Sequence, residues 1–281
     1  MTDIPIRSGD LILMLSSGPV SAMIAWCGDS IYSHAALMAD NGDLMEASAS
    51  GVRRYPLAKR LADRSEVVYL DGFRSLNKAG LPLSETERAA VVAAGEAFIG
   101  TPYEFGKLLE IGIISAVRQK LPEHPLARYL VREALDHLLE NDGRAMICSE
   151  FVYNSFLLAK LDPPGTVTPT VVVAQPSGLP FPKIDWVAFA KEMWQLLQAR
   201  PHVAALRATA SPETLGVDIG DDELTGRMAQ ARAKLGVGGL LASSAPAAAG
   251  SVVPNPNPKL VTPLDLASSP SHSALGRLVQ Y

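Results

Sequence analysis

The chain has 281 residues, of which 48% are hydrophobic and 19% charged, a composition typical of a globular protein with a sizeable core. The formal net charge is −4, and no basic stripe with interleaved aromatic residues is present, which argues against nucleic-acid binding. The two cysteines, Cys27 and Cys148, do not form a C-x-x-C pair, so neither a disulfide framework nor a local zinc motif is expected.

The N-terminal segment lacks the features of a signal peptide. Residues 1–15 contain a single arginine, an acidic residue after it and a short apolar run, without the three regions that a cleavable signal requires. No uncharged apolar run in the chain approaches the ~18 residues that span a bilayer. We therefore expect a cytoplasmic protein without a transmembrane segment, and signal-independent secretion as an effector stays open as an alternative.

The first predicted elements are a buried strand at Leu11–Leu15 and a helix at Val20–Trp26. Between them lies a Ser-Ser-Gly-Pro break whose proline suits the first turn of a helix. A β-hairpin follows, with strands at Ser33–Met38 and Leu44–Ser48. This hairpin carries two candidate site residues, His34 and Glu46.

The register of the hairpin decides whether His34 and Glu46 can cooperate, because a shift of one residue moves a side chain to the other face. A two-residue Asn41-Gly42 turn would place the two side chains on opposite faces. A three-residue Asp40-Asn41-Gly42 loop would place them on the same face, with Ser48 opposite His34. The sequence is compatible with both registers.

The middle of the chain is mainly helical in pattern. Residues Gly51–Arg64 are basic and predict a turn and a short helix, and Glu66–Leu70 predicts a strand. Ser84 begins a helix with a capping-box pattern that ends near Gly100. From Lys107 to Glu140 two helices are expected, as an insertion over about residues 107–144.

The helix that begins at Cys148 carries the strongest candidate for chemistry. Its apolar residues recur at helical spacing, so one stripe faces a core. A thiol at a helix N-terminus lies at the positive end of the helix dipole, which favours the reactive thiolate. The alternative is a buried structural cysteine, since free cysteine is among the most buried residue types.

The C-terminal third changes in composition. A helix is expected at Trp186–Gln198 and another at Asp221–Leu235, after which Gly, Ala, Ser and Pro predominate. We therefore predict one domain at residues 1–200 and a C-terminal extension at 201–281. From Leu241 onward the extension is expected to be mostly disordered, or a tail that docks a protein partner.

A cysteine nucleophile needs an imidazole partner, and the imidazole needs a polar group that fixes its tautomer. Cys148, His34 and Glu46 supply these residue types, and Tyr103 lies in a conspicuous TPYEFG loop. Each also has an ordinary structural interpretation, as a packed aromatic or a satisfied strand residue. A zinc site made of the first three is chemically possible, but without a local ligand motif we expect no metal.

The motifs GDLIL, SHAAL, LMEAS, TPYEFG and ICSEFVYNSF follow one another in the order seen in circularly permuted NlpC-type papain-fold proteins of the YiiX/YebB-like group, which this chain resembles. The resemblance spans about Arg7 to Lys160. It implies an α+β fold in which an antiparallel sheet packs on the cysteine-bearing helix, and a helical insertion departs from the minimal family pattern.

The resemblance also implies roles for the site residues. Cys148 corresponds to the nucleophile, His34 to the general base, Glu46 to the residue that orients it, and Tyr103 to a neighbour of the developing oxyanion. The implied reaction is hydrolysis of an amide bond through a thioester, without a cofactor, in a peptide or a peptidoglycan stem peptide.

Two other functions stay open. A lipid-directed acyltransferase or esterase would use the apolar Leu108–Val117 stretch as an acyl groove or membrane contact. A non-catalytic binding or effector-docking module is the alternative from a different class, because a fold does not fix a function. Cys27 has no counterpart in the family pattern and is expected to be structural.

Overall fold

The computed structural model describes residues 5–48, 50–102, 106–140, 146–174, 178–197, 219–237 and 250–281. Its strands are β1 (Leu11–Ser16), β2 (His34–Met38), β3 (Asp43–Ser48), β4 (Gly51–Pro56), β5 (Val67–Ser75) and β6 (His272–Gln280). Its helices are α1 (Pro19–Cys27), α2 (Leu57–Ala62), α3 (Glu85–Glu96), α4 (Gly106–Arg118), α5 (Pro125–Glu140), α6 (Cys148–Leu157), α7 (Trp186–Leu197), α9 (Asp221–Lys234) and α10 (Pro263–Ser268), with the 3-10 helix η2 (Pro258–Leu260). The predicted α+β class is confirmed.

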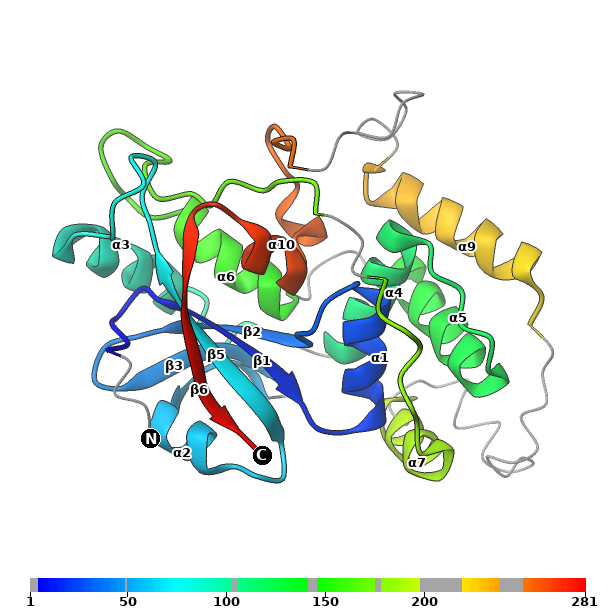
Figure 1. Cartoon of the computed structure of the whole chain (residues 1–281). Coiled ribbons are helices and arrows are strands. Elements are labelled where there is room, and N and C mark those ends of the chain that lie inside the picture. Colours follow the sequence, from blue (N-terminus) through cyan, green and yellow to red (C-terminus); the bar gives the residue numbers. More distant parts are fainter. Residues whose placement is uncertain are drawn as a thin grey trace.

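The strands form one antiparallel sheet in the order β4-β3-β2-β1-β5-β6. Helix α6 packs against β2 and β3, with α3 beside it, and Figure 1 shows both helices on one side of the sheet. Helices α1, α4, α5, α7 and α9 gather beside the sheet as a second layer of the molecule (Figure 1). The expected antiparallel sheet on the cysteine-bearing helix is therefore present.

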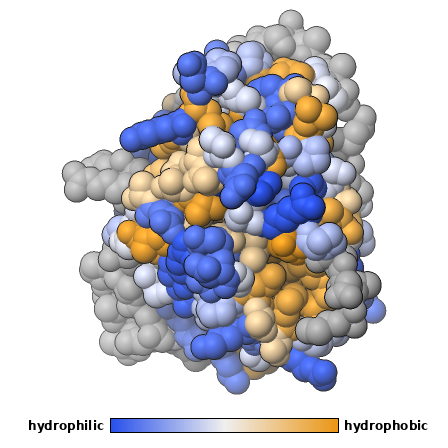
Figure 2. Space-filling model, turned by 90° about the vertical axis from the view of Figure 1, so that its left-hand side faces the viewer, coloured by the Kyte–Doolittle hydropathy of each residue, from blue (hydrophilic) through white to orange (hydrophobic). Residues whose placement is uncertain are grey.

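Alternation along the strands separates two apolar clusters on the two faces of the sheet. One cluster contains Leu13, Ala35 and Leu37 together with Cys148 and Phe151 of α6. The other cluster lies on the opposite face and is covered in part by leucines of α2; its buried members are Ile12, Met14, Ala36, Met38, Leu44, Val67 and Leu70. The face in Figure 2 mixes hydrophilic and hydrophobic residues.

The pairing of β2 with β3 decides the hairpin register. Ala36 lies directly opposite Glu46, and the amide of Ala39 donates to the carbonyl of Asp43 at 2.8 Å. The loop between the strands is therefore the three-residue one, and its last residue, Gly42, has a φ of 78° that favours glycine. This register places His34 and Glu46 on the same face.

The helices of the expected insertion are present as α4 and α5, and α4 packs on α1, α5 and α9. A Cβ on Gly112 would lie 2.5 Å from the carbonyl oxygen of Ala134, so α4 and α5 approach closely where α4 has a glycine. The apolar side chains of α4 are buried in this helical cluster. No helix within the described ranges has the length and apolar character that a membrane crossing requires.

Two expectations about the fold are wrong. Gly51–Pro56, expected as a turn, is strand β4, because the charges of Arg53 and Arg54 are paired with acidic side chains. Of residues 241–281, expected to be mostly disordered or a docking tail, 241–249 lie outside the described residues, and 250–281 contain η2, α10 and β6. Since β6 pairs with β5 along its length, the extension completes the sheet, and the boundary at residue 200 does not separate a fold unit.

Candidate active site

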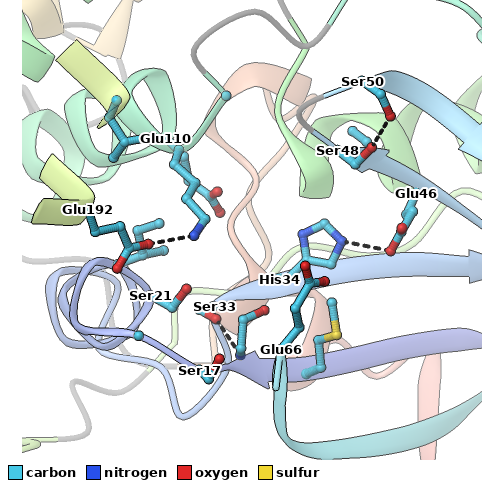
Figure 3. Close-up of a pocket in the computed structure, with 18 of the residues that line it drawn as sticks. Ser17, Ser21, Ser33, His34, Glu46, Ser48, Ser50, Glu66, Glu110 and Glu192 are labelled. Carbon is cyan, nitrogen blue, oxygen red and sulfur yellow. Dashed lines mark hydrogen bonds and ion pairs between the residues drawn. The ribbon is translucent and has the colours of Figure 1, made fainter. Parts of the chain in front are cut away.

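The structure brings His34 and Glu46 together from neighbouring strands. The Nε2 atom of His34 lies 3.5 Å from Oε2 of Glu46, and Figure 3 shows the imidazole directed at the carboxylate. Neither atom has another hydrogen-bond partner among the described residues, and both are buried. This contact orients the ring and leaves its second nitrogen facing away from Glu46, toward the part of the cavity that contains Glu110 (Figure 3).

Two arginines hold Glu46 on the side away from the imidazole. Its Oε1 accepts hydrogen bonds from Arg60 at 2.6 Å and from Arg53 at 2.9 Å. Burial works to raise the pKa of Glu46, but the hydrogen bond and attraction of His34 and the charges of Arg60 and Arg53 outweigh it and lower the pKa to about 2. Glu46 is therefore ionised and fixed in position.

Cys148 is the first residue of α6 and is fully buried. Its Sγ donates to Oε1 of Glu110 on α4 at 3.3 Å, and the backbone N–H groups of Ala35 and Ser149 are directed at the sulfur. Burial, followed by the negative charge of Glu110, raises the pKa of Cys148 well above its ordinary value, although the two N–H groups act in the opposite direction. The expectation that the helix N-terminus favours the thiolate is therefore wrong for this arrangement.

The structure does not place Cys148 and His34 in direct contact. Within the described ranges no hydrogen bond joins them. Because side chains alternate along β2, Ala35 lies on the face of the sheet that α6 covers, whereas His34 lies on the same face as Glu46. The backbone N–H of Ala35, the residue that follows His34, nevertheless acts to lower the pKa of Cys148. Cys148 and His34 thus lie at the same end of β2, on its two sides.

A cavity of about 840 Å³ lies in front of these residues. His34, Glu46 and Glu110 line it, whereas Cys148 lies behind Glu110 and is not part of the wall. Several hydroxyl groups face the same space, including those of Ser17, Ser21, Ser33 and Ser48 (Figure 3). An occupant would therefore meet hydroxyl groups and paired charges, beside apolar side chains such as Met14, Ile24 and Leu196.

Tyr103, the fourth predicted site residue, lies outside the described residues. Three residues of the site were missed in the sequence: Arg53, Arg60 and Glu110. The arginines belong to the basic stretch expected as a turn and helix, and strand alternation from Glu46 across a hairpin would have been the signal for Arg53. Glu110 interrupts an apolar run of α4, which is an identifiable signal, because a buried glutamate is rare unless it is paired.

The residues expected as possible zinc ligands do not converge. In the described part of the chain, no three His, Cys, Asp or Glu side chains are arranged to hold a metal ion. Cys148 contacts Glu110, whereas His34 contacts Glu46 on the other side of β2.

No family model and no curated protein matches this chain. Among solved structures, the chain is similar to one described as the crystal structure of the metalloprotein yiiX from Escherichia coli O157:H7. That similarity has a TM-score of 0.36 and 19% sequence identity, and it covers 54% of this chain and 66% of that chain.

Proposed function

We propose that this protein is a thiol hydrolase of the permuted papain type, which cleaves an amide bond with Cys148 as nucleophile and the His34–Glu46 pair as its base. The observation that carries the proposal is the position of the sulfur, at a helix start, where the backbone N–H of Ala35, the residue next to His34, favours the thiolate. The residue types of a nucleophile, an oriented imidazole and backbone donors are thus all present at one end of β2.

In the proposed reaction the side chain of Cys148 first turns from Glu110 toward the cavity, and its S–H proton passes to the ring nitrogen of His34 that faces away from Glu46. The thiolate attacks the amide carbonyl, and a carbon–sulfur bond forms. His34 then gives the proton to the departing amine as the carbon–nitrogen bond breaks, and water hydrolyses the thioester. The backbone N–H of Cys148, at the first position of α6, is a donor for the developing oxyanion.

The cavity favours a polar amide substrate, such as a peptide or a peptidoglycan stem peptide, over an acyl chain. Its walls carry serine hydroxyls and the Lys107–Glu192 ion pair at 2.8 Å. The side chains of Leu108, Ile111 and Ile114, which an acyl groove or a membrane contact would use, are buried in the helical cluster. The lipid-directed alternative thereby loses the feature on which it depended.

The test is hydrolysis of a panel of fluorogenic peptide amides by the full-length protein and its variants. Cys148→Ser should lower kcat/KM by at least about 10³-fold and His34→Ala by about 10²-fold or more, whereas Cys27→Ser should resemble the wild type. Mass spectrometry of acid-quenched reactions should detect an acyl group on Cys148. Turnover that survives in Cys148→Ser would contradict the proposal.

One observation favours a non-catalytic binding module as the second candidate. The thiol is fully buried and its pKa is raised by burial and by Glu110, which is the opposite of an activated nucleophile. A binding module would hydrolyse none of the amides and would still take up a ligand in the cavity. Isothermal titration with the same peptides, using Cys148→Ser, separates binding from turnover.

A further inference from the structure

Glu110 is placed between the proposed nucleophile and the cavity. It is almost fully buried, it lines the cavity together with His34, and its Oε1 accepts the S–H of Cys148 at 3.3 Å. Figure 3 shows Glu110 across the cavity from the His34–Glu46 pair. A molecule in the cavity therefore meets the carboxyl of Glu110 before it meets the sulfur.

The groups around the sulfur of Cys148 have opposite electrostatic effects on its thiolate form. The N–H groups of Ala35 and Ser149 would stabilise a thiolate, and the carboxyl of Glu110 destabilises it. A buried negative charge next to a developing second negative charge is strongly unfavourable, because the interior screens charges weakly. The proton therefore stays on sulfur while Glu110 is ionised and in place.

Three ion pairs lie on the elements that surround the cavity and α6. They are Glu150 on α6 with Lys259 at 3.4 Å, Lys107 on α4 with Glu192 on α7 at 2.8 Å, and His34 on β2 with Glu46 on β3 at 3.5 Å. None of these six side chains is hydrogen-bonded to Sγ within the described residues, whereas Glu110 accepts its S–H. The state of the thiol is thus most directly sensitive to the state of this one carboxyl.

We propose that Glu110 guards Cys148: its carboxylate holds the S–H proton and separates the sulfur from the cavity, so that the thiol becomes reactive only when this carboxyl is neutralised or turned aside. The proposal deepens the function proposed above and rests on it for the role of Cys148. Helix α4 is fixed by its close packing on α5 at Gly112, so the opening movement is a rotamer change of Glu110 rather than a shift of the helix.

The test is the rate at which iodoacetamide alkylates Cys148 in the full-length protein, followed by mass spectrometry. Glu110→Gln removes the charge and keeps the size of the side chain, and Glu110→Ala also opens the path to the sulfur. At pH 7 we expect Glu110→Gln to raise the rate about tenfold or more, since each unit by which the thiol pKa falls gives about ten times more thiolate. Glu110→Ala should raise the rate further.

Two controls separate the guard from indirect effects. Glu66→Gln makes the same chemical change at another carboxylate that lines the cavity, and it should leave the Cys148 rate within about twofold of wild type. Cys27 is buried, and its pKa is raised to about 12 by burial, so its alkylation in the same molecule reports unfolding. In a folded Glu110 variant Cys27 stays unreactive.

If Cys148 is alkylated in Glu110→Gln at the wild-type rate or more slowly, while Cys27 stays unreactive, the proposed role of Glu110 is wrong. A lower rate would instead identify Glu110 as the base that activates the thiol. The outcome is independent of turnover: a faster alkylation in Glu110→Gln supports the guard even if Cys148→Ser retains hydrolysis and the proposed function fails. Conversely, if Cys148→Ser abolishes hydrolysis and Glu110→Gln leaves the alkylation rate unchanged, only the proposed role of Glu110 is contradicted.

Discussion

Glu46 and Glu110 are both buried glutamates that line one cavity, yet they act in opposite ways. Glu46 faces His34 and two arginines, and these neighbours lower its pKa to about 2 despite its burial. Glu110 faces the thiol of Cys148 and helps to raise the pKa of that thiol. The comparison shows that charged partners can outweigh burial, as they do at Glu46, or add to it, as Glu110 does at Cys148.

The largest effect on stability is expected when the ion pairs of Glu46 are removed. Glu46→Gln leaves Arg60, whose side chain is 4% exposed, without its buried carboxylate. Removing one partner of a buried ion pair costs about 3–5 kcal/mol of the free energy of unfolding. Urea denaturation at pH 7 measures this loss.

Glu96→Gln is the matched control for that experiment. Glu96 also pairs with an arginine, Arg54, but both side chains are partly exposed to solvent, at 44% and 29%. An exposed pair contributes less than about 1 kcal/mol, so this variant should remain close to wild type. Equal losses in the free energy of unfolding would show that burial does not make the Glu46 ion pairs more stabilising than an exposed pair.

A third buried titratable group, His272, sharpens the comparison because no opposite charge among the described residues compensates its burial. Burial lowers the pKa of His272 from 6.5 to about 3. A folded-state pKa below the unfolded one means that stability is lost as the pH falls below 6.5. We expect this histidine to cost roughly 2 kcal/mol between pH 7 and pH 5.

His272→Asn should remove most of that loss. The measurement is the difference in the free energy of unfolding between pH 7 and pH 5, by urea denaturation of wild type and variant. Stability that falls equally with pH in both proteins would show that His272 does not remain neutral in the folded state.

The smallest effect is expected at the second cysteine. Cys27 is buried beside the hydroxyl of Ser115, which lies at 4.0 Å from its sulfur, and it does not line the cavity. Cys27→Ser should cost about 1 kcal/mol of stability, because a buried hydroxyl has a hydrogen-bond partner there. Alkylation of Cys148 should not change. A change as large as that caused by Glu110→Gln would show that the two thiols are coupled.

Much of the fold was predictable because local signals agreed with the final packing. The capping box at Ser84 begins α3, and the sulfur-bearing residue Cys148 begins α6, as expected from pattern alone. The failures have physical reasons. The charges of Arg53 and Arg54 made the sequence of β4 unlike that of a strand. The pairing partner of β6 is β5, which lies some 200 residues earlier in the chain, so no local pattern indicated the pairing.

The site was predictable residue by residue but not as an arrangement. His34 and Glu46 were identified, and their contact depended on the loop length at Gly42, which the sequence left open. The thiolate expected at Cys148 followed from the helix dipole, a local effect. The opposing carboxylate of Glu110 comes from a helix 38 residues away in sequence, and no local pattern reports such a contact.

The most direct test of the account is whether His34 acts on Cys148. The measurement is the pH dependence of Cys148 alkylation by iodoacetamide in Glu110→Gln, with and without His34→Ala. If His34 and Cys148 form one site, removing the imidazole raises the apparent pKa of the thiol and slows alkylation at pH 7 by about tenfold or more. Superimposable profiles for the two proteins would contradict the account, because the thiol would then be indifferent to the imidazole.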